Sequence, residues 1–144
     1  MKIALASDHG GFQLKQEMKK YLEGQGYEIL DLGTDSEESV DYIEYGQNCA
    51  QTVVDGKADK GIVFCGTGIG VSIAANKVKG ARCALCTNGF MAGMAAAHNN
   101  ANLIALGGRI LSKEEAINIT DTWLKTDFEG GRHQRRVDKL DSLR

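Results

Sequence analysis

Short, almost continuously apolar segments alternate along the chain with segments in which apolar side chains recur at helical spacing. The apolar segments predict five strands, at residues 2–7, 27–33, 60–66, 82–86 and 101–108. The other segments predict helices near residues 14–22, 42–55, 71–78, 90–98 and 114–125, and a C-terminal helix over 132–143. Strands without a polar face are typical of parallel sheets that helices cover on both sides. We therefore expect an α/β fold with an open, doubly wound five-stranded sheet, since five strands are too few for an eight-stranded barrel.

The length and the charge balance exclude several classes of protein. A chain of 144 residues matches one domain, which we expect to span residues 1–144. Seventeen Lys and Arg face nineteen Asp and Glu, and only 6% of residues are aromatic, which argues against a nucleic-acid-binding protein. The sequence has no apolar run near 20 residues, and its start is too weakly apolar for a signal peptide. We expect a cytoplasmic protein that does not span a membrane.

The four cysteines are expected to be thiols, because the cytoplasm keeps most cysteines reduced. Cys83 and Cys86 form a C-x-x-C pair, a spacing that zinc and redox sites use. In a strand, however, side chains three positions apart point to opposite faces, and the sequence has no second pair that would complete a four-ligand site. We therefore interpret this pair as part of the core.

Polar and glycine residues gather at the carboxyl ends of the predicted strands, where open α/β sheets bind their ligands. Asp8 and His9 follow the first strand, and Arg109 follows the fifth. The third strand ends in CGTGIG (65–70), which opens a helix and can point several backbone N–H groups at an anion. The glycine spacing and the lack of a later acid argue against a dinucleotide site. There is no Walker Lys, and Val71 stands where a cysteine phosphatase would have arginine.

Each candidate residue also has a purely structural interpretation. Cys65 at a helix start is favoured as a reactive thiolate, but a cysteine that ends a core strand can also be simply buried. Thr67 either contacts a ligand or caps the helix, and His98 is a favourable dipole partner at a helix end. Arg132 and Arg136 share a helix face that suits phosphate binding or a solvated basic surface.

Taken together, the segments resemble the ribose-5-phosphate isomerase B family, which also contains the galactose-6-phosphate isomerase subunits. The resemblance covers nearly the whole chain and rests on SDHGGF (7–12), CGTGIGVSIAANKVKGAR (65–82), HNNANLIALGGR (98–109) and GRHQRR (131–136). It implies a Rossmann-like fold and a homodimer, or a dimer of such dimers, with active sites built across the subunit interface. It also implies a phosphorylated sugar as substrate, exchange of aldose and ketose through a cis-enediol(ate), and neither a metal nor a redox cofactor.

The resemblance assigns a role to each matching position. Cys65 matches the base, Thr67 a hydroxyl that assists it, and His98 the residue that opens the furanose ring. The N–H groups of the loop match an anion hole, and three arginines match a phosphate grip. The implied substrate-binding residues are Asp8, His9, Tyr42, Gly66, Gly68, Gly70, Asn99, Arg109, Arg132 and Arg136. Some family members use a glutamate elsewhere as base, so Cys65 indicates the cysteine subgroup.

Two departures from the family pattern concern the rim of the pocket. Ile43 follows Tyr42 where the family often has proline, and Asn88-Gly89 stands where an Asp and a larger residue are frequent. The full residue set favours a ribose 5-phosphate isomerase. The alternatives are an isomerase of allose or galactose 6-phosphate, and a non-catalytic protein that binds sugar phosphates.

Overall fold

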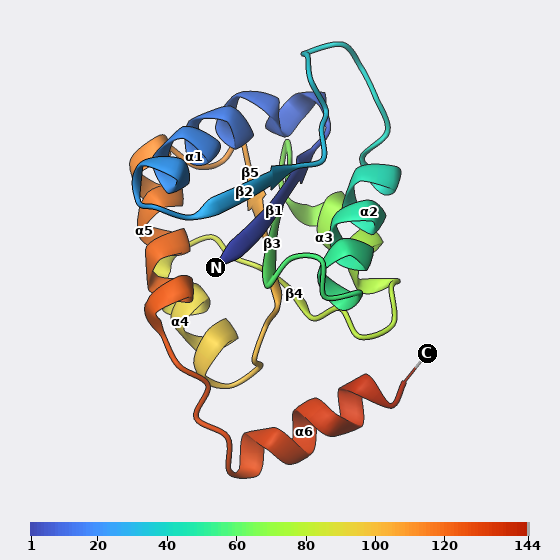
Figure 1. Cartoon of the computed structure of the whole chain (residues 1–144), viewed down its shortest axis with the longest axis vertical. Coiled ribbons are helices and arrows are strands. Elements are labelled where there is room, and N and C mark those ends of the chain that lie inside the picture. The colour runs from blue at the N-terminus through green and yellow to red at the C-terminus, as the bar shows by residue number, and fades with distance from the viewer. Residues whose placement is uncertain (144) are drawn as a thin grey trace.

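Five parallel strands form one sheet, in the order β2-β1-β3-β5-β4, in the computed structural model, which describes residues 1–143 (Figure 1). The strands are β1 (Lys2–Ser7), β2 (Glu28–Asp31), β3 (Lys60–Cys65), β4 (Cys83–Leu85) and β5 (Leu103–Gly107). In the register, Ser7 lies opposite Phe64 and Cys65 lies opposite Gly107. The chain winds outward in both directions from β1 and β3, so the topological switch point lies between their carboxyl ends.

Helices cover both faces of the sheet. One face carries α1 (Phe12–Gly24), α4 (Gly89–Ala97) and α5 (Lys113–Lys125), and the other carries α2 (Tyr42–Val54) and α3 (Ile69–Asn76). A short 3-10 turn, His9–Gly11, leads from β1 into α1. The predicted fold class is confirmed, with a five-stranded parallel sheet between two helical layers and a further C-terminal helix.

The two faces are filled by side chains of different size. The first contains large residues such as Phe64 and Trp123, whose indole Nε1 donates to the Ala101 carbonyl at 3.1 Å. The second contains small ones, and a Cβ added at Gly61 would lie 2.9 Å from the Cys49 sulfur. Glycine at position 61 therefore lets α2 approach the sheet closely.

The final helix, α6 (Arg132–Asp141), lies below the sheet in Figure 1, near the amino ends of the strands. It is held by the buried side chain of Val137 and by Arg82, whose Nη1 lies 2.9 and 3.0 Å from the two carboxylate oxygens of Asp141. Among the described residues, the helices are too short or too polar to cross a bilayer.

The predicted elements are all present, and their ends differ from expectation by a few residues. The strand predicted at 27–33 is shorter, because Gly33 has a left-handed φ of 95° and turns the chain away. The strand predicted at 82–86 covers only 83–85, and the helix predicted from residue 71 begins at Ile69. The predicted C-terminal helix ends at Asp141, and residue 144 of the expected domain lies outside the described residues.

The C-x-x-C pair lies as the strand interpretation predicts. Cys83 packs with the core on the side of α2 and α3, whereas Cys86 belongs to the core on the side of α1, α4 and α5. All four cysteines are free thiols. Burial raises the pKa of Cys49 to about 12 and that of Cys86 to about 11, and it also raises the pKa of Cys83.

Candidate active site

Two turns meet at the topological switch point, one after β1 and one after β3. The Asp8 amide donates to the Phe64 carbonyl at 3.2 Å. A Cβ added at Gly10 would lie 3.0 Å from the amide nitrogen of Gly66. Because β1 and β3 are neighbours, the polar segments at their carboxyl ends lie against each other, as the strand order requires.

Cys65 ends β3 and points its sulfur into the glycine-rich turn. Only 5% of the residue is exposed, and its Sγ accepts a hydrogen bond from the Gly68 amide at 3.1 Å. Gly68 has a φ of 82°, and a Cβ there would lie 2.7 Å from the Leu85 side chain. Glycine is therefore required for the turn that brings this N–H to the sulfur.

Thr67 and Tyr42 lie along the same loop. The Thr67 hydroxyl oxygen accepts from the Ile69 amide at 3.2 Å, so it binds the first amide of α3 while its own proton stays available to a ligand. The Tyr42 ring, at the start of α2, lies over Gly70, where an added Cβ would be 2.7 Å from ring carbons. Glycine at position 70 therefore leaves room for an aromatic wall beside the loop.

Asp8 and His9 are fixed by hydrogen bonds to backbone amides. The buried carboxylate of Asp8 accepts from the Gly11 amide at 3.1 Å and so caps the short 3-10 turn. His9 accepts from the Val40 amide through Nδ1 at 3.2 Å. Because Nδ1 is the acceptor, a neutral His9 carries its proton on Nε2 and can donate it to a ligand.

Arg109 brings a positive charge to the loop. Its amide donates to the Gly66 carbonyl at 2.9 Å, and the Gly108 amide donates to the Cys65 carbonyl at 2.8 Å. The guanidinium lies over Gly66, with Nη1 3.0 Å from the position of an added Cβ. One cluster therefore combines a thiol, an imidazole, free amides and a guanidinium. We call this cluster the thiol end, and its residues are Asp8, His9, Tyr42, the loop 65–70 and Arg109.

The remaining predicted site residues lie at the opposite end of the sheet. The helix α4 begins after the carboxyl end of β4 and runs back, so that His98 and Asn99 come shortly before the amino end of β5. The helix α5 runs back in the same way and delivers Arg132 and Arg136 on α6. We call this group the histidine end. One chain does not bring the two groups together, because the length of the sheet separates them.

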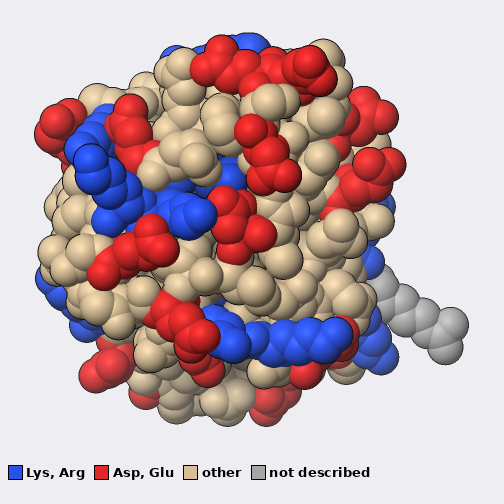
Figure 2. Space-filling model, turned by 45° about the horizontal axis from the view of Figure 1, so that its top comes forward, with Lys and Arg blue, Asp and Glu red and all other residues tan. Residues whose placement is uncertain are grey.

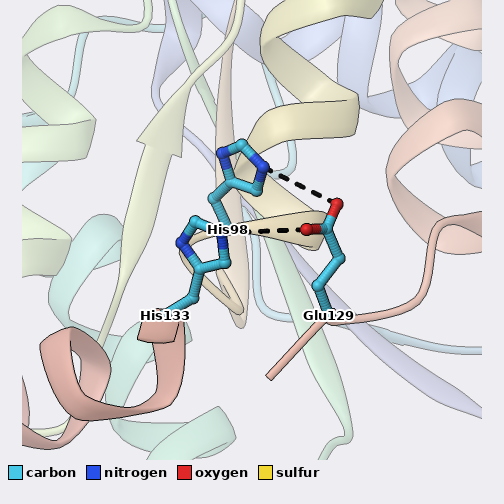
Figure 3. A group of neighbouring side chains, drawn as sticks. All are labelled: His98, Glu129 and His133. Atoms are coloured by element: carbon cyan, nitrogen blue, oxygen red, sulfur yellow. Dashed lines mark ion pairs between the residues drawn. The ribbon is translucent and has the colours of Figure 1, made fainter. Parts of the chain in front are cut away.

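Sequence reasoning missed a contact at the histidine end. The rings of His98 and His133 stack with centroids 4.1 Å apart and planes 10° apart, and the Glu129 carboxylate lies beside both (Figure 3). Burial lowers the pKa of His133, and the charges of His98 and Arg132 lower it further. The only signal for this cluster in the sequence is the EGGRH segment (129–133), in which two glycines precede the helix.

One face of the molecule is mixed in charge, and the histidine end contains a cavity. On the face shown in Figure 2, basic and acidic side chains lie side by side rather than in broad areas of one sign. A cavity of about 430 Å³ lies at the histidine end, between α6 and the loop before β4, and Asn99 is among its lining residues.

Comparison with known proteins places these features in context. The family model described as ribose/galactose isomerase matches residues 3–140. Ribose-5-phosphate isomerase B of Escherichia coli is 44% identical, over 99% of this chain and 95% of that protein. A structure of ribose-5-phosphate isomerase B from Clostridium thermocellum has a TM-score of 0.97 and 53% identity, and covers 99% of this chain and 96% of that one. The enzyme from Mycoplasma genitalium with bound ribulose-5-phosphate has a TM-score of 0.93 and 41% identity, over 98% and 94% of the two chains.

Proposed function

The chain belongs to the ribose/galactose isomerase family, and on this premise we propose that it interconverts ribose 5-phosphate and ribulose 5-phosphate in the cytoplasm. The reaction moves a proton between two neighbouring sugar carbons through a cis-enediol(ate). It requires a base, donors for the developing oxyanion, a group that opens the sugar ring and an anchor for the phosphate. The observation that carries the proposal is the Cys65 sulfur, held by the Gly68 amide at the switch point of the sheet.

The thiol end supplies the base and the oxyanion donors. Cys65 takes the proton from the carbon next to the carbonyl, and a positioned base contributes about 100- to 10,000-fold in rate. The Gly68 amide stabilises the thiolate before reaction. The N–H groups of Gly66 and Gly70 then face the oxygen on which charge develops, together with the Thr67 hydroxyl. Asp8, His9 and Tyr42 hold the sugar beside the loop.

The histidine end of a second copy supplies the remaining groups. We propose a homodimer in which His98 of the partner subunit opens the furanose ring and Asn99 of the partner subunit contacts the sugar. Arg132 and Arg136 of the partner subunit then bind the phosphate together with this chain's Arg109. Arginines suit this role because their planar guanidinium groups bind phosphate oxygens in a bidentate manner.

Exposed apolar side chains support this arrangement. Ile69 and Ile73 lie on one face of α3, directly after the catalytic loop, and more than half of each is exposed. Leu140 on α6 is also half exposed. Side chains of this kind next to both halves of a divided site are typical of a surface that another subunit covers.

Turnover by the purified protein tests the proposal. We expect conversion of ribose 5-phosphate, and we expect Cys65→Ala to lower kcat by at least about 100-fold with an unchanged circular dichroism spectrum. Retention of more than a tenth of the wild-type kcat would exclude Cys65 as the base. Faster turnover of allose or galactose 6-phosphate would assign the chain to the hexose branch, and binding without turnover would make it a non-catalytic protein.

A further inference from the structure

Three side chains that can bind a metal ion converge at the histidine end. The Nε2 of His98 lies 3.6 Å from one carboxylate oxygen of Glu129, and the Nε2 of His133 lies 3.7 Å from the other (Figure 3). The ligand atoms of the three residues all lie within 4.8 Å of one another. The cluster thus combines two imidazoles with one carboxylate.

The backbone holds the three residues in this arrangement. The Glu129 amide donates to the Ala97 carbonyl at 3.0 Å, which ties the segment before α6 to the end of α4 beside His98. Gly130 and Gly131 then have φ values of 67° and 58°, in the left-handed region that favours glycine. This turn brings His133 back against His98, and only 7% of His133 is exposed.

The separations are close to those of a tetrahedral site. Metal–ligand bonds of about 2.0–2.1 Å place neighbouring tetrahedral ligand atoms about 3.4 Å apart. The two N–O separations, which go to different oxygens of Glu129, exceed this by a few tenths of an ångström, and the other separations, which reach up to 4.8 Å, must shorten as well. The stacked rings point their nitrogens in parallel, so each must rotate to aim at one ion. The terminal torsion of histidine is broad, and such a rotation is accessible.

The ligand types in the cluster select the kind of ion. Glu129 contributes one carboxylate with one negative charge, and His98 and His133 contribute two imidazole nitrogens. Hard ions such as Mg²⁺ and Ca²⁺ prefer several oxygen ligands, while Zn²⁺ binds well to imidazole.

We propose that His98, Glu129 and His133 form a binding site for a divalent ion of the Zn²⁺ class, with water in the fourth position. The ion takes the Nε2 of His98, which can then no longer exchange a proton with the sugar ring. Bound ion therefore inhibits the isomerase. The inhibition rests on the proposed function, whereas binding of the ion does not.

Calorimetric titration of tag-free protein with Zn²⁺, in a buffer without phosphate or chelator, tests binding. We expect one ion per chain. We also expect Glu129→Gln and His133→Asn to raise the Kd for Zn²⁺ at least tenfold, because the loss of a residue that only orients a metal ligand already lowers metal affinity by about 10- to 100-fold. Glutamine has the same size as glutamate, and the Glu129 side chain is 57% exposed. We therefore expect the Glu129→Gln variant to fold. Glu17→Gln, on the exposed face of α1, is the matched control.

Thiols also bind zinc, so Cys65→Ser is the second control and should leave the Kd unchanged. Co²⁺ should give the visible absorption of a tetrahedral ion with nitrogen and oxygen ligands, without a thiolate charge-transfer band. Three results would overturn the site: no binding, an affinity in both cluster variants within tenfold of wild type, or loss of binding in Cys65→Ser.

Inhibition is measured in a separate experiment. The turnover rate of each variant with Zn²⁺ is divided by the rate of the same variant without Zn²⁺. We expect wild type and Glu17→Gln to be inhibited at the Zn²⁺ concentration that fills the site, and Glu129→Gln to resist inhibition at that concentration. Binding without inhibition would show that His98 is not needed for turnover. An inactive protein that still binds Zn²⁺ would refute the proposed function and leave the site intact.

Discussion

At the scale of single residues, the hydrogen bond from the Gly68 amide supports the proposal that Cys65, although only 5% exposed, acts as the base. Burial in apolar surroundings raises the pKa of Cys49, Cys83 and Cys86, which have no such donor beside a turn of free amides. Cys65 ends its strand in the core on the side of α2 and α3, but its sulfur accepts a hydrogen bond from the Gly68 amide. The reactivity of the four thiols should therefore not follow their exposure.

Alkylation by iodoacetamide near neutral pH should label Cys65 first, because the thiolate is the reacting form. Cys83 is the sharpest comparison, because it is more exposed than Cys65 but has a raised pKa. Peptide mapping after short exposure measures the order of labelling. Ribose 5-phosphate should slow the labelling of Cys65 more than inorganic phosphate does. Earlier labelling of Cys83, or no protection by the sugar phosphate, would show that the site is misplaced.

Arg136 tests the proposed phosphate grip. Loss of a charge-assisted hydrogen bond to phosphate costs about 1.5–3 kcal/mol, so Arg136→Ala should raise KM by about 10- to 100-fold. Arg135→Ala is the matched control, because Arg135 is also exposed on α6 but points in a different direction around the helix from Arg136. Equal KM values for both variants and wild type would mean that α6 presents only a solvated basic face.

At the scale of elements, a buried ion pair joins α1 to β2. Lys15 is fully buried, and its Nζ lies 2.7 Å from Oδ1 of Asp31, which also accepts from the Gly33 amide at 3.0 Å. Burial acts to raise the pKa of Asp31, but the hydrogen bonds from Lys15 and Gly33 outweigh it and hold the pKa below its usual value. The pair ties α1 to β2, which lies at the edge of the sheet and has β1 as its neighbouring strand.

Asp31→Asn should therefore lower the free energy of unfolding by about 3 kcal/mol at pH 7, since it leaves a buried ammonium without its counter-ion. The folded-state pKa of Asp31 is depressed. Its contribution is thus fully present above the unfolded value of about 3.9 and is lost as the pH falls through the folded value.

Urea unfolding at fixed protein concentration, between pH 7 and pH 3, measures both effects. The stability of wild type should fall more steeply below pH 4 than that of Asp31→Asn. The exposed Asp35→Asn should follow wild type throughout. Parallel pH profiles for wild type and Asp31→Asn would mean that the pair contributes nothing.

The same element shows what the sequence could and could not predict. Apolar runs predicted all five strands, and their polar ends predicted the turns that meet at the switch point. Lys15 lies within a helix that the apolar spacing predicted, but a lysine is usually exposed. Its burial depends on the ion pair with Asp31, which belongs to β2 and which the helix pattern does not reveal. Glu129 was missed for a similar reason, since its place beside His98 depends on a hydrogen bond between its amide and the carbonyl of Ala97 on another element. The catalytic roles themselves stay predictions.

At the scale of the whole molecule, the parallel topology separates the two halves of the site. Helices that follow parallel strands run back to the amino edge, so His98 on the end of α4 cannot reach Cys65 at the carboxyl edge of the same sheet. A five-residue strand alone spans about 16 Å. The homodimer that we propose is two-fold symmetric, so it would place the histidine end of each chain against the thiol end of the other and build two equivalent sites.

Subunit exchange between inactive variants tests this arrangement directly. In a heterodimer of Cys65→Ala and His98→Ala chains, one site contains both substitutions and the other contains neither. Random exchange between equal amounts of the two variants makes half of the dimers mixed, and each mixed dimer has one intact site out of two. The mixture should therefore regain about a quarter of the wild-type activity per chain. His98→Ala mixed with Arg136→Ala is the control, and it is assayed at a substrate concentration far below the KM of Arg136→Ala. Both substitutions lie at the histidine end, so each site of that mixed dimer keeps one defect and the mixture should regain little. Mass spectrometry of differently labelled chains proves the exchange. No recovery by the first pair despite exchange would mean that Cys65 and His98 act within one chain, and the dimeric site would have to be abandoned.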